Sequence, residues 1–288
     1  MKSNLLAEYK FNKTRPILAH KDSYLAFKEK IESNINASAL PGNTILLTPD
    51  VPYENIFGVA VLDFSGFMVN TASAIDEQFY GVISLQNFCQ KFQLAGLDDE
   101  VKSIIIDFDS GGGYVSYMEE TAALIAEISA DKPVYAYTSG LLCSAAYFCA
   151  VNCTQIFASP SARVGNIGTY SEYLTLNGES TTKDGITKSV FPDAGYTVTT
   201  FQSGEDKTIG SEFIPLTPEQ EEQIQSDIDY LGNSFRQTVN TMRGGVKPEF
   251  MTGLAYTGKQ AMDTNSNLID GTINSLALLV KKVIETNK

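Results

Sequence analysis

The chain has 288 residues, enough for one large domain or a main domain with a smaller appendage, and it can bury a substantial core. Its 34 acidic residues outnumber the 21 basic ones, which leaves a net charge of -13 and no basic cluster to follow a phosphate backbone. This balance excludes nucleic acid and anionic membrane surfaces as expected partners.

The N-terminal region, residues 1 to 55, has weak periodicity and ends in LPGNTILLTPDVP, where proline and glycine interrupt regular structure. We therefore expect a loosely attached extension. Its first apolar run is broken by Glu8, and nowhere in the chain do about 18 apolar residues follow one another. We expect no signal peptide and no membrane span, and a location in the cytoplasm.

Short β-branched and aromatic runs alternate with amphipathic segments after residue 56. The runs at 59–64, 103–108 and 133–138 predict strands, and the segments at 83–95 and 115–130 predict helices. Within 115–130, apolar residues including Met118 and Ile125 form one stripe, as expected of a helix that lies on a sheet. The alternation predicts βαβ units and an α/β fold with a mostly parallel sheet.

The second half of the chain continues with strand-like runs at 154–158 and 196–202. Between them, NGESTTKDGITKSVFPDAG is polar and rich in turn formers, so we expect an exposed insertion. The segment LTPEQ then predicts a helix start, with Thr217 as N-cap, Pro218 at the first helical position and Gln220 completing a capping box. This helix should reach about Met242.

The cysteines and the single histidine bear on metal binding. A zinc site would need CxxC pairs or added histidines, and Cys89, Cys143, Cys149 and Cys153 form no such pattern. We therefore expect no metal, and reduced cysteines that serve as small apolar side chains. His20 lies in the irregular N-terminal region, where we expect a solvated surface histidine.

Cleavage of an acyl bond without a metal requires a nucleophile, a base and oxyanion donors. Ser144, in GLLCSAAYFCAVNC, lies between a strand-like run and a helix-forming run, so it is either a helix cap or a nucleophile. A histidine base is nearly excluded, because the chain has a single histidine, His20. Asp107 and Asp109 together could form a carboxylate pair, but they flank a strand end and can equally serve there to cap and turn. The surviving base type is a lysine whose pKa is lowered by burial.

Three consecutive glycines, at 111 to 113, follow an apolar strand. Such a run predicts either a tight turn or a loop whose amides hold an oxyanion or a phosphate. Neither GxGxxG nor a Walker lysine is present, which makes nucleotide binding the weaker interpretation.

Four motifs in order carry a family resemblance: DFDSGGG, CSAAYFCAVNCTQIFASPSARVGNIG, FQSGEDKTIG and YTGKQAMDTNSNLIDG. Together they resemble the signal peptide peptidase A family of serine peptidases, and more closely its branch of phage capsid-assembly (minor capsid protein C) proteases. The resemblance implies a ClpP/crotonase-like α/β spiral over residues 56–275, followed by a helical tail at 276–288. It also implies a Ser-Lys dyad that needs no cofactor.

The resemblance assigns roles to individual residues. Ser144 matches the family nucleophile and Lys207 the general base, while Gly112, Gly113 and the amide of Ala145 match the oxyanion hole.

Two features depart from the family pattern. Ala145 and Ala146 stand where the family usually has a glycine, so we expect a narrower cleft beside Ser144. Asn166 replaces a serine that helps to hold the lysine. Because an asparagine carbonyl can accept a lysine N–H, we expect Asn166 to orient Lys207.

The resemblance implies a serine endopeptidase that forms an acyl-enzyme and binds its peptide substrate as an extended strand. The implied substrate is a phage capsid or scaffold protein, met in the host cytoplasm or the prohead. Neighbouring copies often complete the cleft in such proteins, so we expect a homo-oligomer. Three alternatives stay open: a cellular peptidase that degrades signal peptides, an inactive scaffold component with a peptidase fold, and a crotonase-like acyl-CoA enzyme.

Overall fold

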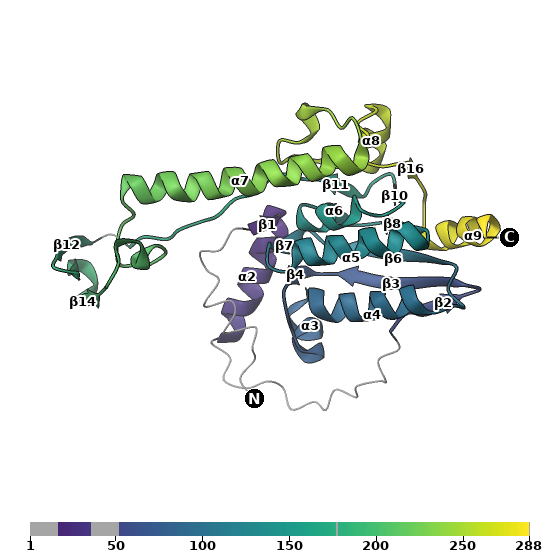
Figure 1. Ribbon diagram of the computed structural model, residues 1–288. Helices are drawn as coiled ribbons and strands as arrows, with labels where there is room; N and C mark the ends of the chain where they lie inside the picture. The colour runs from purple at the N-terminus through teal and green to yellow at the C-terminus, as the bar shows by residue number, and fades with distance from the viewer. Residues whose placement is uncertain (1–16, 36–51, 177, 288) are drawn as a thin grey trace.

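The structure is a computed structural model, and it describes residues 17–35, 52–176 and 178–287 (Figure 1). Its main sheet has six strands in the order β16-β10-β8-β6-β3-β2, and all neighbours are parallel except the pair β2 and β3. The strands are β2 (Glu54–Ile56), β3 (Val59–Ser65), β6 (Ser103–Asp109), β8 (Val134–Thr138), β10 (Gln155–Ala158) and β16 (Gly271–Thr272). The predicted α/β class with a mostly parallel sheet is confirmed.

The strands β3, β6, β8 and β10 share one pattern: each is followed directly by a short strand that belongs to another sheet. In chain order these short strands are β4 (Phe67–Val69), β7 (Gly112–Tyr114), β9 (Leu141–Cys143) and β11 (Arg163–Gly165). β4 and β7 belong to a second sheet with β1 (Ile17–Ala19) and β5 (Val82–Ser84), while β9 and β11 pair in a third with β15 (Ala255–Thr257). The repetition winds the chain into a spiral of similar units.

Helices cover both faces of the main sheet (Figure 1). One face packs against α4 (Leu85–Leu97), α5 (Met118–Asp131) and α6 (Ala145–Ala150), and α3 (Ala74–Tyr80) precedes β5. The buried stripe of α5 includes Met118 and Ile125, as predicted. The opposite face packs against α9 (Leu276–Thr286), so the predicted helical tail is part of the core.

The N-terminal region is more structured than its sequence pattern suggests. Residues 17–35 form β1 and α2 (Lys21–Ile35), and Tyr24 and Phe27 are buried. The ring of Phe27 stacks on Phe67, with centroids 4.2 Å apart. Residues 1–16 and 36–51 of the predicted extension lie outside the described part of the chain. The sequence pattern is weak here because the helix is stabilised by packing more than by its own periodicity.

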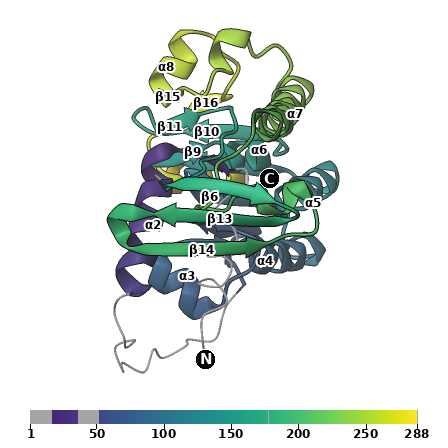
Figure 2. The same cartoon turned by 90° about the vertical axis from the view of Figure 1, so that its left-hand side faces the viewer.

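The predicted polar insertion contains β12 (Glu179–Lys183) and β13 (Ile186–Phe191), and the strand predicted at 196–202 is β14 (Tyr196–Phe201). The three strands form one antiparallel sheet, which we call the arm. Buried and exposed residues alternate along β13, a period-2 pattern that its polar composition conceals. The arm lies at the end of α7 (Pro218–Arg243) that is remote from α6, and Figure 2 views the molecule from that end. α7 begins with the predicted capping box of Thr217 and Gln220.

Short helical segments complete the chain: η1 (Pro192–Ala194), η2 (Glu205–Thr208), η3 (Pro248–Phe250) and α8 (Gly258–Asp263). Within the described ranges, none of the helices has the length and apolarity needed to cross a membrane.

Candidate active site

Ser144 joins β9 to α6 in a backbone conformation that residues with a side chain rarely adopt, with φ 56° and ψ -125°. Neighbouring backbone holds it there. Its N–H donates to the carbonyl of Gly165 at 2.8 Å, and its own carbonyl accepts from the N–H of Phe148 at 2.9 Å. Such a conformation costs about 1–3 kcal/mol, and a strained strand-to-helix turn is a known way to present a nucleophile.

The hydroxyl of Ser144 does not cap the helix, although the residue occupies the N-cap position of α6. At five other helices the N-cap side chain accepts a hydrogen bond from a backbone N–H of the first turn: those of Ser73, Ser84, Thr217, Thr257 and Ser275. The Ser144 Oγ is buried and has no hydrogen-bond partner in the described part of the chain. The structure therefore contradicts the alternative that this serine is simply a helix cap.

The glycine run lies beside Ser144 because Ser110 and Leu142 form a parallel bridge, and the N–H of Cys143 donates to the Ser110 carbonyl at 3.1 Å. Gly112 and Gly113 are strand residues of β7, not a tight turn. A Cβ at Gly113 would collide with the backbone of Met68 in β4, so only glycine fits there. The N–H of Gly112 is already bonded to Ser110 Oγ at 3.2 Å. Gly113 lies opposite Leu18 in the antiparallel pair of β1 and β7.

Ala145 and Ala146 are both fully buried in the main core. Their methyl groups therefore do not line an open cleft in this conformation, and the expected narrowing beside Ser144 has no support. The nearby cysteines are free thiols, as expected, and burial raises the pKa of Cys143 to about 12. A thiol of that kind stays protonated and is a poor nucleophile.

Lys207 and Ser144 do not meet within one chain. Lys207 is exposed on η2, just after β14 of the arm, whereas the Ser144 hydroxyl is buried and unbonded. The side-chain N–H of Asn166 donates to the carbonyl of Gly253 at 2.5 Å, and no hydrogen bond joins Asn166 to Lys207 in the described part of the chain. The structure thus groups Ser144, Gly112, Gly113 and Ala145 and leaves the predicted base at the other end of α7.

The remaining titratable candidates have structural explanations. Asp109 accepts the N–H of Leu141 at 3.0 Å, which fits the strand-end alternative. Asp107 is half-buried, and burial, together with the charges of Asp63 and Asp109, raises its pKa to about 6. His20 is less solvated than we expected: its side chain is 24% exposed, and its Nδ1 is buried without a hydrogen bond, 4.0 Å from Oδ2 of Asp22. No cluster of metal-ligating side chains occurs among the described residues.

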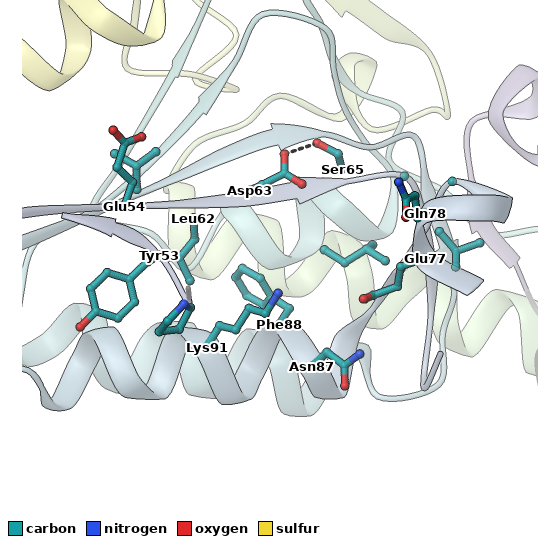
Figure 3. Close-up of a pocket in the computed structure, with 16 residues that line it drawn as sticks. Tyr53, Glu54, Leu62, Asp63, Ser65, Glu77, Gln78, Asn87, Phe88 and Lys91 are labelled. Carbon is teal, nitrogen blue, oxygen red and sulfur yellow. Dashed lines mark hydrogen bonds between the residues drawn. The ribbon is translucent and has the colours of Figure 1, made fainter. Parts of the chain in front are cut away.

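A pocket of about 790 Å³ lies between β3 and α4 and contains none of the predicted site residues (Figure 3). Its charged lining consists of the carboxylates of Glu54, Asp63 and Glu77 and the single cation Lys91. This excess of negative charge is unfavourable for the phosphates of coenzyme A. The crotonase-like acyl-CoA alternative therefore gains no support from the pocket.

Two curated phage proteins are similar to this chain. The head-tail preconnector protein GP5 of Enterobacteria phage P21 is 26% identical over 226 residues, which are 77% of this chain and 42% of that protein. The capsid assembly protease C of Escherichia phage lambda is 28% identical over 225 residues, which are 77% of this chain and 48% of that protein. The chain thus spans less than half the length of either relative.

Among solved structures, the enoyl-CoA hydratase of Thermoplasma volcanium is similar over 81% of this chain and 75% of its own, with 13% identity and a TM-score of 0.42. A likeness this distant does not bear on function. The model of peptidase family S49 matches residues 126–283, more than half of the chain, and this range contains Ser144, Asn166 and Lys207. The predicted peptidase resemblance is confirmed, and the chain belongs to peptidase family S49.

Proposed function

We propose that the chain is a serine endopeptidase in which Ser144 is the nucleophile. The observation that carries the proposal is the strained Ser144, whose buried hydroxyl neither caps α6 nor bonds any other group, within the range that matches the peptidase family. A residue that keeps both backbone strain and an unsatisfied hydroxyl is typical of a functional site.

The reaction proceeds through an acyl-enzyme. The neutral amine of Lys207 takes the proton from Ser144 Oγ, which attacks the scissile carbonyl carbon, and the amides of Gly113 and Ala145 stabilise the oxyanion. The ammonium of Lys207 then protonates the leaving amine as the C–N bond breaks. A water molecule, deprotonated by Lys207, attacks the acyl-enzyme carbonyl. The ammonium of Lys207 then protonates Ser144 Oγ as the C–O bond to the serine breaks, which releases the carboxylic acid and restores the hydroxyl and the neutral amine.

Lys207 reaches Ser144 from another copy of the chain in this proposal. Within one chain η2 lies beside the first turn of α7, where the side-chain N–H of Gln220 donates to the carbonyl of Glu205 at 3.1 Å. α6 packs nearer the other end of this long helix, where Phe148 meets Phe235 (Figure 1). The side-chain oxygen of Asn166 remains the atom that would accept the incoming lysine, because the side-chain nitrogen is bonded to Gly253.

Exposed apolar side chains on the arm and α7 support assembly. Val190, Tyr196 and Phe201 on the arm and Tyr230 on α7 are exposed, although such side chains favour burial. We propose that neighbouring copies cover them in a homo-oligomer, in which each Ser144 is served by the Lys207 of another copy.

The proposed substrate is a capsid or scaffold protein. This part of the proposal rests on similarity to a capsid assembly protease and a head-tail preconnector protein of phages. The inactive-scaffold alternative makes the opposite prediction, because a degenerate protein would not hydrolyse any peptide.

Complementation between two inactive variants tests the proposal. Ser144→Ala and Lys207→Ala should each fail to hydrolyse fluorescently labelled casein, and Lys207→Arg should fail as well because a guanidinium stays charged. Co-expression of Ser144→Ala with Lys207→Ala should restore about a quarter of the wild-type activity, since random assembly pairs an intact serine with an intact lysine at about one site in four.

Two controls make the result decisive. Differently tagged chains purified together show that mixed oligomers have formed, and a Ser144→Ala, Lys207→Ala double variant co-expressed with Ser144→Ala must stay inactive. Hydrolysis by wild type without recovery in verified mixtures would contradict a dyad shared between copies. Absence of hydrolysis by folded wild-type protein, with no labelling of Ser144 by a fluorophosphonate, would favour the inactive scaffold.

A further inference from the structure

The N-terminal strand β1 occupies the outer edge of β7, the strand that contains the glycines of the candidate site. The two strands are antiparallel, with Leu18 opposite Gly113 and Ala19 opposite Gly112. The pairing continues past β1, where the N–H of His20 donates to the carbonyl of Gly111 at 2.5 Å. An edge strand offers unpaired N–H and C=O groups to any extended peptide, and here residues 17–20 of the chain already use them.

This pairing brings residues 17–20 close to the nucleophile. Ser110, the residue before the glycine run, accepts the N–H of Cys143, and Cys143 precedes Ser144. Ser144 is only 1% exposed, although an endopeptidase must admit a peptide to its nucleophile. The described conformation is therefore closed at the place where a substrate strand has to bind.

The helix α2 anchors the strand. Tyr24 and Phe27 are buried with Phe67 and Tyr114, and the Phe27 and Tyr114 rings meet edge to face with centroids 6.2 Å apart. Gly111 is matched to this helix, because a Cβ at that position would collide with the side chain of Ser23. The first turn of α2 and the glycine run are thus complementary in shape.

We propose that residues 17–20 are an inhibitory strand, which occupies the position of the substrate on β7 and must leave before a substrate can bind. The inference rests on the proposed function, since it assumes that the β7 edge beside Ser144 receives the substrate. It predicts that the chain binds an extended peptide weakly until its own segment is displaced.

Peptide binding to a variant without the proposed nucleophile, which cannot cleave the peptide, tests this inference. In full-length Ser144→Ala, we compare binding of a fluorescent peptide with the sequence of residues 17–24, ILAHKDSY, by anisotropy, with and without a second substitution. His20→Pro removes the N–H that bonds Gly111, while a proline just before a helix leaves α2 intact. It should tighten peptide binding about tenfold or more, because the displaced segment no longer competes.

Further variants control for loss of folding. His20→Ala keeps the backbone N–H and should bind the peptide as the parent does. Ala19→Glu places a carboxylate at a buried position of the docked strand, so it should act in the same direction as His20→Pro. Circular dichroism must show an unchanged helix content for each variant.

The outcomes separate the two proposals. Equal binding by the parent, His20→Pro and Ala19→Glu would overturn the inhibitory strand. The proposed function is judged separately by fluorophosphonate labelling of Ser144 in the chain with an intact serine. Labelling that is equally fast in wild type and His20→Pro supports the nucleophile and overturns the inhibitory strand. Tighter peptide binding without any labelling shows that residues 17–20 cover a peptide-binding edge of β7, but it overturns the nucleophile and therefore the inhibitory role.

Discussion

At the scale of single residues, Ser144 carries two local costs that the rest of the chain must offset. Its φ of 56° is strained for a residue with a Cβ, and its buried hydroxyl lacks a hydrogen bond. Proteins retain such costs where a substrate or partner group completes the site. The comparison with Ser73, a serine at an equivalent helix position that does cap its helix, isolates the effect.

We predict that Ser144→Ala abolishes hydrolysis and raises the free energy of unfolding by about 1 kcal/mol, because it removes an unsatisfied buried hydroxyl. Ser73→Ala should instead lower the free energy of unfolding by about 1 kcal/mol, since the cap of α3 is lost. Urea unfolding of dilute protein measures both changes. A Ser144→Ala protein that is less stable than wild type would mean that the hydroxyl has a stabilising partner.

Asp107 gives the stability a predicted pH dependence. Its pKa is raised from 3.8 to about 6, first by burial and then by the charges of Asp63 and Asp109, so folding favours its protonated form. The stability from this group is complete below about pH 4, is lost as the pH rises, and is absent above pH 6.

We therefore predict that Asp107→Asn is more stable than wild type at pH 8, by about 1–2 kcal/mol after solvent screening of this half-buried group is allowed for. The difference should nearly vanish at pH 4. Urea unfolding at the two pH values provides the measurement. Asp63→Asn should raise the free energy of unfolding at pH 8 by part of the same amount, because it removes one of the charges that raise the pKa of Asp107. If the stability difference between Asp107→Asn and wild type were the same at pH 4 and pH 8, the assignment to Asp107 would be wrong.

At the scale of elements, the site depends on how closely short strands approach one another. β7 lies between β1 and β4, and Gly113 faces the backbone of Met68 without room for a side chain. The close contact fixes the position of the Gly113 amide relative to the β9–α6 turn. The bridge between Ser110, just before β7, and Leu142 in β9 connects the two segments. The glycine is thus required by packing as well as by the proposed chemistry.

We predict that Gly113→Ala lowers the free energy of unfolding by about 1–3 kcal/mol or more, because the methyl group meets backbone atoms that cannot rotate away. Gly168→Ala is the matched control. Its nearest neighbour would be the Cα of Gly253 at 3.6 Å, an ordinary contact, so its stability should stay within about 0.5 kcal/mol of wild type. Thermal unfolding of both variants decides, and equal stability would disprove the close packing.

At the scale of the whole molecule, the arm and α7 extend from the compact spiral and separate the two members of the proposed dyad (Figure 1). In the proposed function, another copy of the chain receives the arm. Phe201 at the end of β14 is 76% exposed, and on the main body Leu97, at the end of α4, is 75% exposed. Leu97 is therefore a matched control for Phe201, because the two side chains are almost equally exposed but lie on different parts of the molecule.

We predict that Phe201→Glu weakens self-association and lowers hydrolysis in parallel, since a carboxylate at an apolar interface is costly to bury. Leu97→Glu, at the C-terminal end of α4 and outside the arm, should leave self-association and hydrolysis unchanged. Sedimentation velocity over a range of protein concentrations measures the association. Were Phe201→Glu to sediment as wild type does, the arm could not be the contact between copies.

The sequence by itself determined the elements whose signals are local. The apolar strands β3, β6 and β8 and the capping box of α7 were predictable because each depends on neighbouring residues along the chain. The motif around Ser144 likewise indicated the family without any structure. Only the tertiary structure decided that β1 pairs with β7, that the polar insertion forms the arm, and that Lys207 lies apart from Ser144. These relations join segments far apart in sequence, and they depend on long-range packing that residue periodicity does not encode.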